Sequence, residues 1–146
     1  MSGAEEADGL YDFLKGFPLD YPNYNLWLER CRSELESGYK KAYYASDMNS
    51  RLIGSIVFQP HKQDPVVLEI KNLRVATEFI RHGVGSVLEL LAEHYAKGLN
   101  FRNIQLDTHE GNDEVIRFFT HKGFQMERKE HIYTQSSQEI VLCKAL

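Results

Sequence analysis

Between residues 66 and 124 the sequence alternates strand-like and helical hydrophobic patterns. An apolar stretch of strand length (66–75) precedes a segment with helical spacing of apolar residues (83–98). A second strand pattern (101–107) and a second helical pattern (112–123) follow. Strands that alternate with helices favour an α/β fold, a sheet with helices packed on its faces. The inward face of the helix at 83–98 is predicted to consist of Val84, Val87, Leu88, Leu91 and Tyr95.

The rest of the chain extends this pattern on both sides. Residues 21–37 carry a helical stripe, and 40–46 and 51–59 form a predicted hairpin. A last hairpin spans 125–146, which gives a mixed sheet of about six strands. Residues 10–14 could form one more short strand before the helix at 21–37, or that strand could be absent. Residues 1–8 are expected to be a flexible acidic tail, and 9–146 one domain.

The apolar pattern of the strand 66–75 changes phase. Leu68 and Ile70 share one face of a regular strand, whereas Leu73 and Val75 share the other. A slip of one residue at Lys71–Asn72 indicates a β-bulge. The alternative is a strand that is buried on both faces and needs no slip.

Composition narrows the class of protein. A chain of 146 residues with 42% apolar and 26% charged residues is expected to fold as about one domain, not to be disordered. No apolar run reaches the ~20 residues of a membrane span, and no secretory signal is visible. Cys31 and Cys143 are far apart and have no partners at metal-ligand spacing. A reducing, cytoplasmic location and no metal are therefore expected.

The net charge of −4 is placed unevenly. Residues 1–20 contain five acidic residues and one basic residue, and the remainder contains sixteen of each sign. The body therefore lacks the excess positive charge that drives binding to nucleic acids.

Gly83 and Gly85 stand at the predicted start of a helix. Main-chain N–H groups there, together with the helix dipole, can hold a pyrophosphate, and Arg81 can add a charge-assisted contact. The alternative is that these glycines only allow a tight turn and close packing. The dinucleotide fingerprint fails, because Leu88 occupies the place of its third glycine, and no P-loop ending is present.

Residues 66–124 resemble the core of the GNAT superfamily of acetyl-CoA-dependent N-acetyltransferases. In that family an apolar strand leads into a segment of the form [Q/R]-x-x-G-x-[G/A], and Val75 and Gly83 here have the typical separation of eight residues. A second signature is a helix that begins at asparagine and ends in Gly-Phe. It corresponds to Asn112 through Gly123-Phe124, and Leu106 on the preceding strand lies six residues before Asn112.

The resemblance implies a fold, a reaction and a site. The fold would be a central mixed sheet flanked by helices, with the family's fourth strand (66–75 here) bulged and splayed. The activity would be transfer of an acetyl group from acetyl-CoA to a primary amine of a small molecule or peptide. The coenzyme would be bound by a pyrophosphate loop, a strand edge along the pantetheine arm, and two helix residues. In this sequence these are Arg81, His82, Gly83, Val84, Gly85 and Ser86; Leu73, Arg74 and Val75; and Asn112 and Phe119.

Two departures from the family pattern matter. Ile80 occupies the usual Gln/Arg position, but the phosphate cradle depends mainly on the backbone. Phe119 replaces the tyrosine that protonates the departing thiolate in many members, and a phenyl ring cannot donate a proton. A catalytically weak acyl-CoA-binding module is therefore an alternative function, and a purely structural interaction domain is another.

Glu69 is the candidate general base. It lies fourteen residues before Gly83, where some members of the family carry their base, and burial among apolar neighbours would raise the pKa of its carboxyl. The alternative is that Glu69 pairs with a basic residue on a neighbouring strand.

Other side chains have weaker claims to the site. His109 could be a substrate contact or a second base, and Tyr133 a replacement acid. Four aromatic residues could line a substrate pocket, although core packing is the alternative for each: Trp27, Tyr43, Tyr44 and Phe58. The hairpin 125–146 is a candidate homodimer interface, as the resemblance implies for C-terminal strands.

Overall fold

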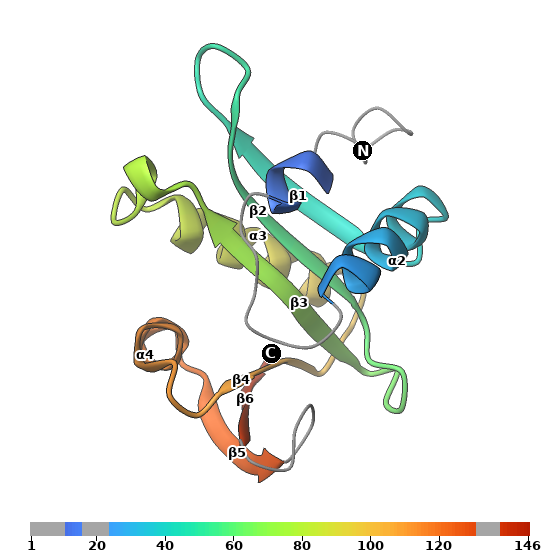
Figure 1. The fold of residues 1–146 in the computed structure, drawn as a ribbon. Coiled ribbons are helices and arrows are strands. Elements are labelled where there is room, and N and C mark those ends of the chain that lie inside the picture. Colours follow the sequence, from blue (N-terminus) through green and yellow to red (C-terminus); the bar gives the residue numbers. More distant parts are fainter. Residues whose placement is uncertain (1–10, 16–23, 131–137) are drawn as a thin grey trace. The chain divides into compact units, whose positions relative to one another are not determined.

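The structure is a computed structural model that describes residues 11–15, 24–130 and 138–146 (Figure 1). Residues 11–15 are helical. The elements that follow are α2 (Tyr24–Glu36), β1 (Lys41–Ser46), β2 (Leu52–Pro60), β3 (Val67–Val75), the short 3-10 helix η1 (Thr77–Phe79), α3 (Val84–Gly98), β4 (Asn103–His109), α4 (Asp113–His121), β5 (Gln125–Glu130) and β6 (Glu139–Ala145). The predicted order of helices and strands is confirmed. For residues 10–14 a short strand and its absence were both open, and the four of them that are described form part of a helix, not a strand.

The six strands form one mixed sheet in the order β1-β2-β3-β4-β6-β5. β3 and β4 are parallel, whereas β1 with β2, β4 with β6, and β5 with β6 pair antiparallel. The sheet and its helices are a mixed α/β fold, as predicted.

The contacts of the chain divide it into two compact units. The first comprises Met1–Gln59 and Ile70–Tyr95, and the second comprises Pro60–Glu69 and Ala96–Leu146. The strand β3 is shared, because Val67–Glu69 pair with β4 inside the second unit and the remainder belongs to the first.

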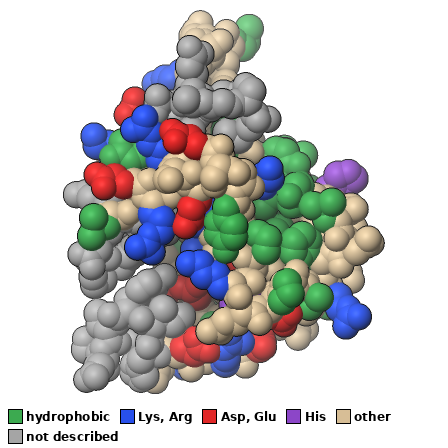
Figure 2. All heavy atoms as spheres, turned by 90° about the vertical axis from the view of Figure 1, so that its right-hand side faces the viewer, with side chains coloured by type: hydrophobic (Ala, Val, Ile, Leu, Met, Phe, Trp, Pro, Cys, Tyr) green, Lys and Arg blue, Asp and Glu red, His purple; other side chains and the backbone are tan. Residues whose placement is uncertain are grey.

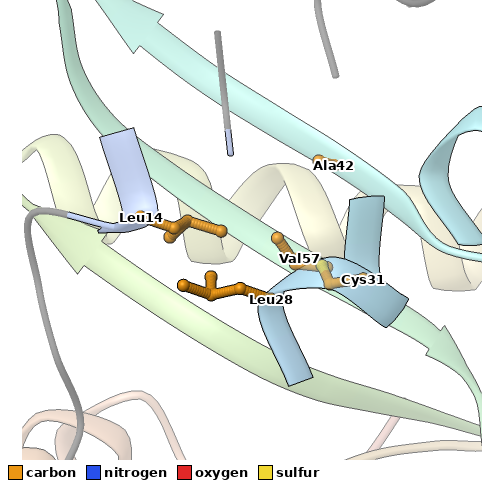
Figure 3. Close-up of a cluster of buried hydrophobic side chains, with 5 residues drawn as sticks. All are labelled: Leu14, Leu28, Cys31, Ala42 and Val57. Carbon is orange, nitrogen blue, oxygen red and sulfur yellow. The ribbon is translucent and has the colours of Figure 1, made fainter. Parts of the chain in front are cut away.

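In the first unit, α2 packs on β1 and β2 through a small apolar cluster (Figure 3). Leu28 and Cys31 of α2 meet Ala42 of β1 and Val57 of β2, and Leu14 joins them from the helix 11–15. Leu14, Leu28, Cys31 and Val57 are each 1% exposed or less, so this cluster fixes α2 against the hairpin.

The helix α3 buries a different stripe from the predicted one. Leu88 is buried as expected, but Val87 and Leu91 are 57% and 39% exposed. The buried positions after Leu88 are Glu89, Ala92, Glu93 and Ala96, and the small alanines let the helix lie close to its neighbours. The apolar spacing alone therefore placed the inward face of α3 incorrectly. Figure 2 shows hydrophobic side chains gathered on part of one face, with acidic and basic side chains next to them.

Side chains of β3 alternate between buried and half-buried from Leu68 to Leu73. The alternation continues through Lys71 and Asn72, so Asn72 is buried on the face of Leu68 and Ile70. The bulge that was expected at Lys71–Asn72 stays a prediction.

In the second unit, α4 ends as its sequence predicts. Gly123 has φ +95°, a left-handed conformation that suits glycine at a helix end. The Phe124 N–H donates to the Phe119 carbonyl at 3.0 Å, and the two rings lie 5.1 Å apart. This arrangement buries both phenylalanines.

Candidate active site

The loop between β3 and α3 leads into the N-terminus of a helix through two left-handed residues. Arg81 and Gly83 have φ +67° and +83°, both left-handed, and α3 begins at Val84. The Val87 N–H donates to the Gly83 carbonyl at 3.1 Å, which is the first bond of the helix. Helix geometry therefore leaves the N–H groups of residues 83–86 without an intrahelical acceptor. The positive end of the helix dipole adds to them, which makes a cradle for phosphate.

Charged side chains surround this loop. Arg81 and His82 are exposed, so each can turn toward a bound anion. Glu78 of η1 would repel a phosphate, but it is neutralised by Arg51, whose Nη2 lies 2.6 Å from the glutamate Oε2. The N–H groups of residues 83–86 could contact a pyrophosphate, whereas the His82 N–H already donates to the Phe79 carbonyl at 3.3 Å. Coenzyme binding at residues 81–86 stays a prediction.

The end of β3 carries the residues expected along the pantetheine arm. Leu73, Arg74 and Val75 are half-buried. The Arg74 guanidinium donates to the Leu73 carbonyl at 2.9 Å, so one lone pair of this carbonyl is already used. The pairing of β3 with β4 covers Val67 to Glu69. Coenzyme contacts at this strand edge stay a prediction.

In the second unit, Asn112 and Phe119 lie on α4. Asn112 occupies the N-cap position of the helix, but its side chain makes no capping hydrogen bond and is exposed. Its amide is therefore available to a ligand. Phe119 is 3% exposed, and its ring makes T-shaped contacts with Phe118 at 5.0 Å and Phe124 at 5.1 Å. An aromatic core contact, not a polar one, holds Phe119 in place.

Glu69 contacts a histidine that the sequence did not reveal. The Oε2 atom of its carboxylate lies 3.4 Å from Nε2 of His61, and the two side chains are 12% and 18% exposed. His61 follows directly after β2, and its N–H donates to the Val67 carbonyl at 2.9 Å, which fixes the loop against β3. The alternative for Glu69 was a basic partner on a neighbouring strand, whereas His61 lies in the loop after β2. Such a pair can also accept and pass on a proton.

His61 was missed because its partner depends on the length of the loop between β2 and β3. No motif marks it, and a histidine in a predicted loop normally faces solvent. Only the register of the neighbouring strands brings its ring to Glu69.

The other candidate side chains of the site are a histidine and several aromatic residues. The Nδ1 atom of His109 accepts the Gly111 N–H at 3.0 Å, so this ring supports a tight turn. Phe58 is 1% exposed and packs on Tyr43 at 5.7 Å and on Tyr95 at 4.9 Å, which favours the core alternative. Tyr44 is 37% exposed. The side chain of Trp27 and all of Tyr133 lie outside the described residues.

No group of three or more His, Cys, Asp or Glu side chains in the described part of the chain could hold a metal ion. None of the described helices is long and apolar enough to cross a membrane.

Comparison with known proteins decides the family. A model of the Acetyltransferase (GNAT) family matches residues 8–124. The chain belongs to this family. A comparison of the sequence with curated proteins finds no match.

Solved structures of GNAT type share the fold of this protein. Ard1 from Thermoplasma volcanium is 23% identical, with 99% of this chain and 94% of that chain covered and a TM-score of 0.77. NAA60 from Arabidopsis thaliana, solved with a bisubstrate analogue, is 16% identical, with 98% and 94% covered and a TM-score of 0.77. A Bacillus subtilis acetyltransferase, solved with CoA, is 21% identical, with 81% and 83% covered and a TM-score of 0.68.

Proposed function

We propose that this GNAT protein transfers the acetyl group of acetyl-CoA to a primary amine of a small molecule or peptide, by direct attack in a ternary complex. The observation that carries the proposal is the set of main-chain N–H groups at residues 83–86, which have no intrahelical acceptor. They lie at the start of α3, in the segment that the family match includes. A pyrophosphate is the group that such a cradle suits best.

Each part of the coenzyme has a candidate partner in the chain. Arg81 and His82 would add contacts to the phosphates, and the end of β3 at Leu73–Val75 would offer its backbone to the pantetheine amides. The uncommitted amide of Asn112 would contact the same arm. Acetyl-CoA supplies the thioester that is to be cleaved.

The acceptor has to lose a proton before or during attack, because an ammonium has no lone pair. Glu69 would accept this proton, directly or through a water, and His61 would stabilise the negative charge of the Glu69 carboxylate. The amine nitrogen then forms a bond to the carbonyl carbon, and the carbon–sulfur bond breaks. A main-chain N–H of β3 would meet the negative charge that develops on the carbonyl oxygen.

Phe119 cannot protonate the departing sulfur. A thiol has a pKa near ~8.5, so the thiolate can leave without a proton from the protein. Phe119 also motivates the second candidate function, a module that binds acyl-CoA with little turnover.

The first experiment is thermal unfolding with and without acetyl-CoA, with NAD and ATP as controls. Ligand at about 100 times its Kd adds ~2.7 kcal/mol, which raises the melting temperature of a chain of this size by roughly 5–11 °C. A shift with acetyl-CoA alone, followed by release of free thiol when amines are added, is the expected result. A shift without turnover of any amine would favour the binding module. No shift at saturating acetyl-CoA would overturn both.

Two further expectations accompany this proposal. Pairing through the hairpin 125–146 would make a homodimer, and the composition of the chain suits the cytoplasm. Both stay predictions.

A further inference from the structure

A recess of about 260 Å³ lies in the second unit, where β3 and β4 are paired. It is smaller than the roughly 300–1,000 Å³ of pockets that hold drug-sized ligands, so it suits a small group. The loop after β2 and the strands β4, β5 and β6 contribute to its lining. Six of the lining side chains carry a polar or titratable group: His61, Asp64, Gln105, Glu127, Arg128 and Cys143.

Gln105 lines the recess without a hydrogen-bond partner. The residue is 8% exposed, and within the described part of the chain no donor or acceptor pairs with its amide. This amide is therefore open to a group that enters the recess. A ligand in the recess that both donates and accepts hydrogen bonds would satisfy this amide.

The recess also adjoins the candidate base. Glu69 and Gln105 are opposite one another in the last pair of the β3–β4 register, and Cys143 of β6 is opposite Gln105 on the other side. Residues paired in this way project from the same face of a sheet. His61 lines the recess and contacts Glu69, so a ligand there would lie beside the pair of Glu69 and His61.

The charges of the lining favour a cation. Asp64 and Glu127 contribute carboxylates, and Arg128 contributes the guanidinium. Arg128 is already bound by two glutamates, Glu127 at 3.1 Å and Glu130 through a short contact to its Nε. Burial raises the pKa of the Cys143 thiol, and the nearby charge of Glu127 raises it further, so this side chain stays uncharged at neutral pH. Two carboxylates and one guanidinium leave one net negative charge in the lining, which favours a positive ligand.

We propose that this recess binds the amine-bearing part of the acceptor, and that the acceptor is a small hydrophilic primary amine, of the amino-sugar or amino-alcohol class. The inference rests on the proposed acetyl transfer. Val67 is the one aliphatic side chain of the lining among the described residues, so an apolar amine would gain little by burial there. Hydroxyl groups of a hydrophilic amine would pair with Gln105, and its ammonium would face Asp64 and Glu127 before Glu69 removes the proton.

The test compares acetylation of glucosamine with that of benzylamine, an apolar amine, and of a peptide with a free lysine. We expect glucosamine to have the highest kcat/KM, by at least about tenfold. Gln105→Leu should raise the KM for glucosamine about tenfold, and leave the KM for acetyl-CoA unchanged. Gln125→Leu, the same change at an exposed position outside the lining, should alter neither. Glu127→Gln, at a half-exposed site where folding is not at risk, should also raise the KM for glucosamine.

A second readout separates this inference from the proposed function. Titration of glucosamine into the complex with unreactive CoA, followed by calorimetry, measures acceptor binding without turnover. Binding that Gln105→Leu weakens supports the recess even if acetyl transfer fails. Preference for benzylamine or the peptide, or equal KM values in wild type and both lining variants, would overturn the recess proposal while acetyl transfer itself stands.

Discussion

Gly54 of β2 lies against Val84, the first residue of α3. A Cβ on Gly54 would come within 2.8 Å of the Val84 Cγ1 atom, 3.2 Å of the Leu88 Cδ1 atom and 3.3 Å of the Arg74 carbonyl oxygen. Side chains do not approach one another this closely, so glycine is required for α3 to begin where it does. The absence of one carbon on β2 therefore positions the N–H groups proposed to hold the coenzyme.

Gly54→Ala is expected to weaken coenzyme binding. The methyl group has to displace the first turn of α3 or the end of β3, at a cost of about 1–3 kcal/mol of overpacking. We expect a lower melting temperature and a Kd for CoA raised by about tenfold or more in calorimetry. Gly98→Ala is the matched control, because no atom lies within 4 Å of a Cβ there and alanine favours the helix. Equal Kd values for both variants would contradict the role of Gly54.

Glu69→Gln is expected to lower kcat by roughly 10²–10⁴-fold, because the amide cannot accept the proton of the acceptor. The KM for acetyl-CoA should stay the same, and the fall in rate should shrink at high pH, where the amine is already neutral. Stopped assays of acetylated product over a pH series measure this. Glu36→Gln, an exposed position on α2 that loses only a surface pair with Arg32, is the control. An unchanged kcat and pH profile would exclude Glu69 as the base.

Phe119→Tyr is expected to change kcat by less than about tenfold, because a thiolate leaves without help from an acid. The new hydroxyl enters a cluster of phenylalanine rings at a position that is 3% exposed. If it finds no partner there, it costs about 1–3 kcal/mol, which appears as a melting temperature several degrees lower. Phe118→Tyr, at the half-buried neighbouring ring, is the control and should be nearly neutral. A large rise in kcat would show that the missing acid limits the enzyme.

Cys31 makes the stability of the fold depend on pH in the alkaline range. Burial raises the pKa of its thiol from 9.0 to about 12. Folding therefore favours the uncharged thiol over the thiolate. The stability that the buried Cys31 thiol contributes is complete below pH 9 and is lost as the pH rises toward 12. At pH 10.5 the loss is roughly 2 kcal/mol. Urea unfolding at pH 7 and 10.5 should show that Cys31→Ala loses less stability between the two than wild type does. The same loss in both would contradict this.

The order of elements was predictable because periodic patterns report local burial. The hairpin 40–59, the strand before Gly83 and the end of α4 at Gly123 all depend on neighbours in the sequence. The inward face of α3 was not predictable from apolar spacing, since the helix buries Glu89 and Ala92 and leaves Val87 exposed. Tertiary contacts decided that face.

The candidate site also has a part that local sequence features predict and a part that depends on distant residues. The helix start after Gly83 was predictable, because glycine spacing and a helix start are local features; coenzyme binding at residues 81–86 stays a prediction. The contact of His61 with Glu69 and the burial of Gln105 were not found, because each depends on the register of strands distant in sequence. Strand register is set by the whole sheet, and no short motif encodes it.

The left-handed conformation of Arg81 has a consequence for efforts to stabilise this protein. An arginine at φ +67° costs about 1 kcal/mol that a glycine would avoid. A search for thermostable variants would therefore favour glycine at this position. If the guanidinium contacts the coenzyme, the most heat-resistant variants of the loop would also be the ones that release their coenzyme most readily.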